Sequence, residues 1–203
     1  MAQIHVVYAH PSPASFTREV FDAFRGGLAD AGHTSTVSDL YAMKFRPELT
    51  LGEYERESTY SARAPLPADV VAEHAKLNAA EVWAFIYPVW WADCPALLKG
   101  WFDRVWTVGF AHQPMSVRPA RRALVLCTAG YSIAELRASG CYAAMRTTML
   151  TDRIGARADS ADFLVLGGRM TDGGADAARW TATKAGHLRQ VTALARSVGV
   201  VQQ

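Results

Sequence analysis

Three short stretches of the sequence carry side chains that can bind a flat, anionic ligand. The first, residues 88–94 (PVWWADC), places Trp90 and Trp91 side by side between an apolar run and a helical pattern. Aromatic faces stack with an offset on planar, apolar ring systems. The alternative is a role in the core or in a dimer contact. Because two adjacent loop residues cannot both point the same way, one of the two is expected to have that role.

The second stretch, residues 9–17 (AHPSPASFT), offers the imidazole of His10 and the hydroxyls of Ser12, Ser15 and Thr17. Ser15 or Thr17 can cap the helix that is predicted to follow. The free N–H groups and the dipole of a helix start favour a phosphate ester. The stretch lacks G-x-G-x-x-G and the P-loop lysine, which argues against Rossmann-type dinucleotide binding and nucleotide hydrolysis. The alternative, which this stretch alone favours, is that Ser15 only caps the helix and His10 only satisfies a backbone group.

The third stretch, residues 128–131 (TAGY), contains Gly130, where the backbone turns sharply or approaches something closely. Its N–H groups can hydrogen-bond a ring carbonyl and stabilise negative charge that develops there; an ordinary strand-to-helix turn is an equal alternative. A phosphate end, a slot for a flat ring and an edge lined with donors together describe a flavin. No hydrolase triad competes, and Cys94 and Cys127 are expected to be small buried hydrophobes.

The rest of the chain must position these stretches. Continuous apolar or β-branched runs predict five strands, at 4–8, 34–40, 82–86, 122–128 and 162–166. Strands that are apolar throughout and alternate with helices predict a parallel sheet covered on both faces. The fold class is therefore α/β, a three-layer flavodoxin-like fold with five parallel strands in the order 2-1-3-4-5. That order brings together the loops after strands 1, 3 and 4, which are the three stretches above.

Helices are expected between the strands. The apolar positions repeat with helical spacing after Ser15, over 67–80, after Pro95, weakly over 133–146 with a break at Gly140, and over 176–198. Within 67–80 the side chains expected to point inward are Val70, Val71, His74 and Leu77, and in the next helix Arg104 is expected on a face away from the apolar one. Residues 41–66 and 107–121 show no sustained period. A loop as long as 41–66 is usually functional or part of an interface.

Length and composition limit the class of protein. We expect residues 1–203 to form a single domain with an ordinary globular balance, in which half of the residues are apolar and 20% are charged. No apolar run is long enough to insert into a membrane, and the N-terminus passes straight into a strand without the basic region of a signal peptide. The 3 cysteines share no metal-ligand spacing and form no disulfide framework, which favours the cytoplasm and no metal site.

Charge is unevenly distributed although the net value is only +2. Residues 1–100 carry 8 basic and 12 acidic side chains, a net −4, whereas residues 101–203 carry 13 and 7, a net +6. The basic residues are scattered singly, so a nucleic-acid surface is not expected. The excess of basic residues in the second half is instead expected to attract phosphorylated small molecules mildly.

Three segments of the chain match the motifs of a known family. The segments AHPSPASFT, SDLYAMKFRPEL and, most specifically, YPVWWADCPALLKGWFDRVWTVGFAH contain a P-x-x-W loop followed by P-A-x-L-K-G-W-x-D/E-R-V and F-A-x. In these motifs the chain resembles the NAD(P)H:quinone oxidoreductase family of flavodoxin-like flavoproteins. This family includes quinone reductases, modulators of drug activity and ancillary subunits of potassium-efflux systems. The resemblance covers most of residues 4–130 and is thin afterwards.

The resemblance implies a homodimer with one flavin per subunit at the interface. NAD(P)H would give hydride to the flavin N5 and leave, and a quinone or similar small-molecule electron acceptor would then enter the same pocket. The cofactor is expected to be FAD. FMN is the alternative, because the chain lacks the C-terminal segment of the animal enzymes and would cover the adenine end of FAD less completely. The residues expected to bind the cofactor are His10, Ser15, Phe16, Thr17, Pro88, Val89, Trp90, Trp91, Thr128, Ala129, Gly130 and Tyr131.

Two departures from the family pattern affect the expected chemistry. The family often has T-T-G-G in the third loop, where this chain has Thr128 to Tyr131. Larger relatives place a Tyr and a His downstream, and the nearest residues by position here are Glu135 and Cys141, so that pair is absent. Tyr131 is a candidate replacement donor. Together with Trp91 it forms the expected catalytic set.

Three functions remain open from the sequence. The leading one is an NAD(P)H dehydrogenase (quinone)-like flavin reductase, with NADPH or NADH as co-substrate; the arginines of the second half lean weakly toward NADPH. The alternative is a flavin-binding regulatory or ancillary subunit of a membrane transport system with little turnover of its own. A one-electron carrier comes last, because such carriers usually present a strongly acidic docking face.

Overall fold

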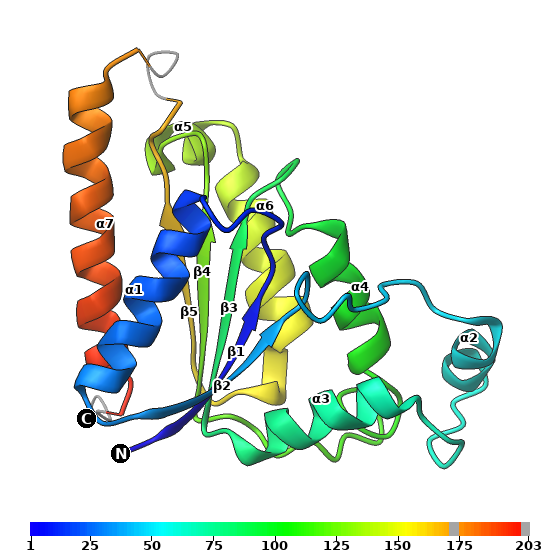
Figure 1. The fold of residues 1–203 in the computed structure, drawn as a ribbon. Helices are drawn as coiled ribbons and strands as arrows, with labels where there is room; N and C mark the ends of the chain where they lie inside the picture. The colour runs from blue at the N-terminus through cyan, green and yellow to red at the C-terminus, as the bar shows by residue number, and fades with distance from the viewer. Residues whose placement is uncertain (171–174, 200–203) are drawn as a thin grey trace.

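The five strands form one parallel sheet in the order β2-β1-β3-β4-β5 (Figure 1), so the fold class expected from the sequence is confirmed. The structure is a computed structural model, and it describes residues 1–170 and 175–199. The strands are β1 (Gln3–Tyr8), β2 (Thr34–Asp39), β3 (Val82–Pro88), β4 (Arg122–Thr128) and β5 (Ala161–Leu166). The helices are α1 (Phe16–Asp30), α2 (Leu51–Ser58), α3 (Ala68–Ala79), α4 (Ala96–Val105), α5 (Ile133–Ala138), α6 (Cys141–Thr147), the π-helix η1 (Thr148–Ile154), the 3-10 turn η2 (Gly155–Arg157) and α7 (Ala177–Ser197). Among the described residues, no helix is both long and apolar enough to cross a membrane.

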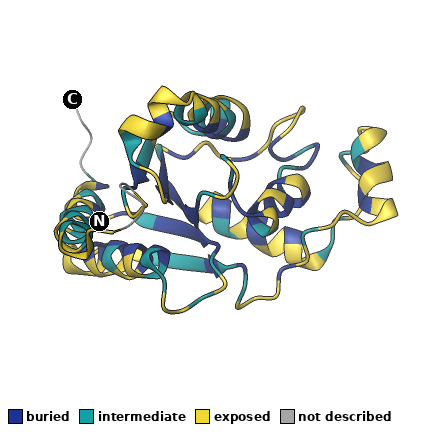
Figure 2. Cartoon of the chain, turned by 90° about the horizontal axis from the view of Figure 1, so that it is seen from above, coloured by how far each residue is buried: buried dark blue, intermediate teal, exposed yellow. Residues whose placement is uncertain are grey.

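Helices cover both faces of the sheet. Helices α1 and α7 pack together on one face, and α3, α4, α6 and η1 lie on the other (Figure 1). Figure 2 shows a sheet of dark blue, buried and teal, partly buried strand segments between helices whose outer sides are yellow and exposed. The inner side of α1 carries Val20, Phe24 and Leu28, which are spaced four residues apart, as the helical repeat after Ser15 predicted. Burial of both faces agrees with the mostly apolar sequences of the central strands β1, β3 and β4. The edge strand β2 (TSTVSD) is instead largely polar and only partly buried, so the expectation that all strands are apolar throughout is wrong for β2.

Two apolar clusters lie on opposite sides of the central strands. Phe85 and Val125 belong to the cluster under α3 and α4, whereas Ile86 and Leu126 belong to the cluster under α1 and α7. Neighbouring residues of a strand point to opposite faces, so each strand supplies both clusters. The carboxyl ends of β1, β3 and β4 therefore reach the same edge of a sheet that is fixed on both sides.

Residues 41–66 depart from the sequence-based expectation. They contain α2, which stands away from the sheet (Figure 1), where the sequence shows no sustained period. Thr50 and Glu53 form a capping box at its start: the Thr50 hydroxyl accepts from the Glu53 N–H, and the Glu53 carboxylate accepts from the Thr50 N–H. This pair is a local signal for a helix start. An eight-residue helix with a mostly exposed surface gives no apolar stripe, which explains why periodicity failed to predict it.

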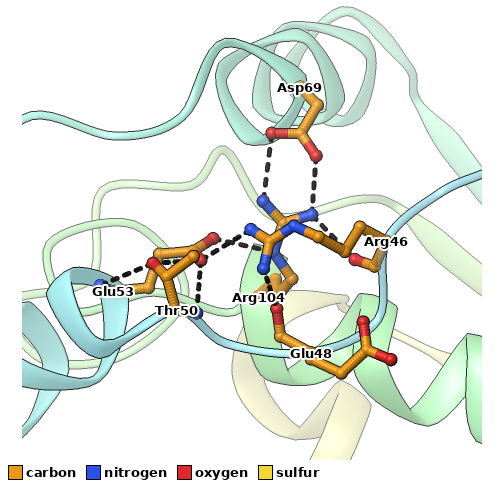
Figure 3. A network of polar contacts seen from close by, with 6 residues as sticks. All are labelled: Arg46, Glu48, Thr50, Glu53, Asp69 and Arg104. Atoms are coloured by element: carbon orange, nitrogen blue, oxygen red, sulfur yellow. Dashed lines mark hydrogen bonds and ion pairs between the residues drawn. The ribbon is translucent and has the colours of Figure 1, made fainter.

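A buried arginine ties the 41–66 segment to the body of the protein (Figure 3). The side chain of Arg104 on α4 is 1% exposed, and it donates to Glu53 at 2.7 Å, to Asp69 at 2.6 and 3.1 Å, and to the Arg46 carbonyl at 2.9 Å. Burial alone would raise the pKa of Glu53, but hydrogen bonds from Arg46, Thr50 and Arg104 outweigh it and lower that pKa to about 2. The expectation that Arg104 faces away from the packed side of its helix is therefore wrong.

A second buried carboxylate, Glu73 on α3, lies beneath the sheet. It accepts from Ser38 at 2.8 Å, from Lys76 at 2.6 Å and from the Trp101 indole at 2.9 Å, and His5 lies 3.7 Å away. Burial alone would raise the pKa of Glu73, but these partners together lower it to about 2. Polar partners on every side make this group a structural anchor for α3.

The α3 helix is also rotated relative to the sequence-based expectation. Val70, His74 and Leu77 point inward as expected, whereas Val71 is 50% exposed and that expectation is wrong. The buried face consists of Val70, Glu73, His74 and Leu77, which are spaced i, i+3, i+4 and i+7, and it includes the fully buried, charged Glu73. At about 100° per residue, Val71 lies about 200° around the helix from Glu73 and therefore faces outward.

Candidate functional site

The three loops singled out in the sequence meet at the carboxyl edge of the sheet. Each continues the ladder into its neighbour: the N–H of Ala9 donates to Ile86, that of Val89 to Thr128 at 2.7 Å, and that of Ala129 to Leu166. These bonds fix the loops side by side at the ends of β1, β3 and β4. In an open parallel sheet, ligands bind in the crevice outside these strand ends, where the strand order reverses.

A cavity of about 490 Å³ opens at this edge. It is within the size range of small-molecule and cofactor sites. Of the site residues expected from the sequence, its lining includes His10, Ser15, Phe16, Thr17, Pro88, Val89, Trp90, Thr128, Ala129 and Gly130. Trp91 and Tyr131 do not line it. The structure thus brings ten of the twelve expected residues into one cavity and leaves the two expected catalytic side chains at its margin.

Five further residues line the cavity and were not found from the sequence, namely Glu19, Arg169, Met170, Trp180 and Lys184. Two follow β5, whose end lies at the same edge as the other strand ends, so strand order alone could have pointed to them. The others come from α1 and α7, where the sequence indicated only packing or a solvated face.

The first loop is held by its own polar groups. The Ser15 hydroxyl accepts from the Arg18 N–H at 3.1 Å and caps α1, and His10 Nδ1 accepts from the Ser12 N–H at 2.9 Å. Both residues therefore have the structural role that was the simpler alternative. The same Nδ1 lies 3.1 Å from the Ser12 carbonyl, and no hydrogen bond within the described residues uses Nε2. The ring thus keeps Nε2 available for a ligand.

The start of α1 leaves backbone donors available beside the cavity. No described hydrogen bond takes up the N–H groups of Phe16 and Thr17, which lie in the first turn of the helix. Such donors and the helix dipole together favour an anion. The Thr17 hydroxyl is instead paired with the Thr128 hydroxyl at 2.7 Å, a buried contact that joins the first and third loops directly.

The outer wall of the cavity is built by α1 and α7. The Phe16 and Trp180 rings meet edge to face with centroids 5.0 Å apart, and Lys184 forms an ion pair with Glu19 at 2.9 Å. Edge-to-face pairs are a favoured arrangement of aromatic rings. This wall places aromatic faces and an ammonium group next to the free N–H groups of the first loop.

The second loop forms a tight turn that carries its tryptophans outward. The Trp90 N–H donates to the Asp93 carbonyl at 2.9 Å, the Asp93 N–H donates to the Trp90 carbonyl at 3.0 Å, and Trp91 and Ala92 have positive φ. Trp90 is 42% exposed and Trp91 fully exposed. The core alternative is therefore wrong for both tryptophans, because the two-residue turn puts their rings outside the packed interior, and the dimer-contact alternative stays a prediction.

The third loop packs against the chain that follows β5. The Met170 N–H donates to the Gly130 carbonyl at 2.7 Å, and the Gly168 N–H donates to the Tyr131 carbonyl at 3.1 Å. A Cβ at Gly167 would lie 2.1 Å from that same carbonyl, so glycine is needed there for the close approach. The Tyr131 side chain is exposed beside the cavity rather than within it.

Cys94 and Cys127 do not contribute a nucleophile. Cys94 and Cys127 are both buried, as expected from the sequence. Burial raises the pKa of the Cys94 thiol to about 12 and that of Cys127 further. A thiol with a raised pKa remains protonated and inert near neutral pH.

Comparison with known proteins places this geometry in a family. A family model described as flavodoxin-like fold matches residues 2–153. A solved structure named NAD(P)H:quinone oxidoreductase, from Methanothermobacter marburgensis, is 41% identical and superposes with a TM-score of 0.91, covering 100% of this chain and 98% of that one.

Curated proteins match over a shorter region. The "Ribosyldihydronicotinamide dehydrogenase-like protein traD" of Penicillium crustosum is 36% identical over 122 residues, which are 54% of this chain and 46% of that protein. The "Ribosyldihydronicotinamide dehydrogenase [quinone]" of Pongo abelii is 36% identical over 123 residues, 54% of this chain and 53% of that protein. The chain spans about half the length of the curated relatives it matches.

Proposed function

The chain belongs to the family of proteins with a flavodoxin-like fold, and from that premise we propose that it is a flavin-dependent NAD(P)H oxidoreductase that reduces a quinone or a similar small acceptor. The observation that supports this most is the single cavity at the ends of β1, β3 and β4, which combines free helix-start donors, a flat wall and a backbone edge. The name of the M. marburgensis structure supports this activity, and the names of the curated relatives support a related oxidation of a dihydronicotinamide, with a quinone as acceptor in the P. abelii protein.

The residues of the cavity suit a flavin. The N–H groups of Phe16 and Thr17 and the Nε2 atom of His10 would hold the phosphate. The backbone from Pro88 to Trp90 would lie along the isoalloxazine ring, and residues 128–130 would border its pyrimidine edge. When bound, the flavin supplies hydride acceptance and donation, and the protein supplies position and electrostatics. Trp91 and Tyr131, at the margin, are left as candidates for contact with the acceptor.

We propose FAD as the cofactor, with FMN as the alternative. The wall formed by Phe16, Trp180 and Lys184 lies beyond the phosphate end and offers an aromatic face and a cation to the second half of FAD. FMN would leave that wall without a ligand. NADPH or NADH is the proposed co-substrate.

A homodimer is the proposed assembly. Large apolar side chains are exposed at the rim of the cavity and on the 41–66 segment, namely Trp90, Trp91, Tyr131, Met170, Met43, Leu49, Leu51, Tyr54 and Tyr60. Exposed apolar surface of this extent marks an interaction site more often than a solvated face. A second copy of the chain would cover the open side of the cavity. Light scattering on the eluting protein is expected to give twice the 22.1 kDa chain mass.

Spectroscopy tests the activity directly. The purified protein, or protein reconstituted with FAD or FMN, is expected to be yellow and to bleach with NADPH or NADH under anaerobic conditions. Turnover with menadione is expected at ordinary enzyme rates, on the order of 1–1000 per second. Mass spectrometry of the flavin released on denaturation then identifies FAD or FMN. A colourless protein that takes up neither flavin would overturn the proposal, and bleaching without turnover would favour an ancillary flavin-binding subunit.

A further inference from the structure

In the second loop, Trp91 is positioned by its backbone and hardly at all by packing, whereas Trp90 is partly covered. Trp91, at the tip of the turn, is 101% exposed, so none of the described residues covers its ring. Trp91 and Ala92 have φ of 51° and 57°, the left-handed values that a type I′ turn requires. Such turns favour Asn-Gly, and side chains with a Cβ carry a free-energy cost there. Something outside the turn must therefore hold it in this conformation.

An almost fully buried arginine makes that contact. Arg153 lies in η1, in the connection between β4 and β5, and its side chain is 5% exposed. Its guanidinium donates to both carboxylate oxygens of Asp93, the last residue of the turn, at 2.8 and 3.0 Å. The same carboxylate accepts the Cys94 N–H at 2.7 Å. The turn is thus fixed at its end by three charge-assisted hydrogen bonds to one side chain.

The guanidinium is itself held from several sides. It lies 5.2 Å from the centre of the Phe102 ring, and one of its nitrogens contacts the sulfur atoms of Cys94 and Met149 at 3.2 and 3.3 Å. The indole of Trp106 donates to the Arg153 carbonyl. Arg153 therefore has one rigid position, and Asp93 is the only carboxylate among the described residues with which it forms an ion pair.

The local backbone supports a functional reading. Arg153 lies within a π-helix, a rare conformation that occurs frequently at functional sites. The ion pair also controls protonation, because Arg153 and the Cys94 N–H outweigh the effect of burial and hold the pKa of Asp93 below its usual range. At neutral pH the pair is therefore fully charged.

We propose that Arg153 is a positioning residue: through Asp93 it sets the conformation of the turn 90–93 and so the place of Trp90 and Trp91 against the bound flavin and acceptor. This inference rests on the proposed function of the cavity. Arg153 itself does not line that cavity, so it would act only through Asp93.

The test compares Arg153→Gln with Arg122→Gln. Arg122 forms a more exposed ion pair with Asp162, through one nitrogen at 2.6 Å, at the start of β4 and so at the opposite end of the strand from the cavity. In Arg153→Gln the exposed side of Asp93 can be rehydrated, so the variant is expected to fold. Asp93→Asn is the second variant, in case the first does not fold.

Two measurements are made on each purified full-length variant. The first is hydrogen exchange of a peptide covering residues 88–98, which reports the Trp90 and Asp93 amides that close the turn. The second is the dissociation constant and visible spectrum of FAD or FMN in a fluorescence titration. We expect exchange at least about tenfold faster and flavin binding about tenfold weaker in Arg153→Gln, with a shifted visible band. Arg122→Gln should match the wild type, and Arg153→Lys should recover part of the loss.

The outcomes separate this inference from the proposed function. Exchange within twofold of the wild type in both Arg153→Gln and Asp93→Asn would overturn the role of Arg153 in holding the turn. Faster exchange with unchanged flavin affinity and spectrum would overturn its role in positioning the cofactor. A wild type that binds no flavin would overturn the proposed function, and the exchange data alone would then decide whether Arg153 holds the turn.

Discussion

Arg104 and Arg153 are both almost fully buried, and each faces one aspartate with two guanidinium nitrogens, yet they hold different amounts of structure. Arg104 joins three segments to α4, through the Arg46 carbonyl, Glu53 and Asp69 (Figure 3). Arg153 joins η1 to a single four-residue turn. Similar ion pairs therefore have different effects: that of Arg104 stabilises the whole 41–66 segment, whereas that of Arg153 sets the conformation of the turn 90–93. The expected effects of mutation differ accordingly.

The largest effect is expected from Arg104→Met. This change removes one of the two arginine partners of Glu53, whose side chain is 8% exposed, and with it the ion pairs that join α2 and α3 to α4. Breaking a buried ion pair by removing one member typically costs about 3–5 kcal/mol, and urea unfolding is expected to give that loss. Lys99→Met, which breaks the exposed pair with Asp103, is the control and should change stability by less than about 1 kcal/mol. Equal losses in the two variants would contradict the special role of Arg104.

The second largest effect is expected at low pH, where protonation of Glu53 weakens the Arg104 network. The pKa of Glu53 is lowered from 4.5 to about 2 in the folded state, so its stabilisation is complete above pH 4.5 and is lost as pH falls toward 2. The linked loss is up to about 3 kcal/mol. Urea unfolding at successive pH values checks it. The Arg104→Met variant should show a smaller acid dependence than the wild type, and an identical dependence would remove Arg104 as a cause.

A glycine on α4 provides a smaller and independent test of the same region. A Cβ at Gly100 would lie 2.3 Å from the Cβ and 2.4 Å from the carbonyl oxygen of Pro47, where the 41–66 segment crosses the helix. Gly100→Ala is expected to destabilise by about 2 kcal/mol through overpacking, in spite of the better helix propensity of alanine. Gly26→Ala on α1, where nothing lies within 4 Å, should instead stabilise by up to about 1 kcal/mol. A gain in stability at Gly100 would show that Pro47 can move aside.

The smallest effect on global stability is expected from Arg153→Gln. Asp93 is 44% exposed and can be rehydrated, so urea unfolding should show a loss of only about 1 kcal/mol. The change should be visible instead in the exchange of the turn amides and in flavin affinity. A global loss as large as that of Arg104→Met would remove the contrast between the two arginines.

The sheet could be predicted from the sequence because its signals are local. Continuous apolar runs mark the strands, and the run at 122–128 matches β4 residue for residue. Ser15 was one of two expected caps of α1, and it caps the helix. Gly140 breaks the helical pattern of 133–146 as expected, since it has a φ of +80° between α5 and α6. Each of these signals determines the structure only of residues close to it in the sequence.

The errors share a different origin. The pattern of α3 assigned Val71 to the interior and could not identify Glu73 as buried, because the partners of that carboxylate lie on β1, β2 and α4. Arg104 was expected on an outer face for the same reason, since Glu53 is 51 residues away. A charged residue can be buried only where distant partners satisfy it, and a single sequence does not give their positions. The capping box of α2 was the exception, a local signal that was overlooked.

The sequence by itself determined the parallel sheet, the order of its strands and therefore the edge at which three loops meet, because apolar runs and helix caps act through neighbouring residues. Only the tertiary structure decided which groups at that edge remain available, since His10 and Ser15 are partly used by their own loop and Trp180 and Lys184 arrive from α7. It also decided that Arg153 reaches Asp93, sixty residues away along the chain. Such contacts depend on how the whole chain packs.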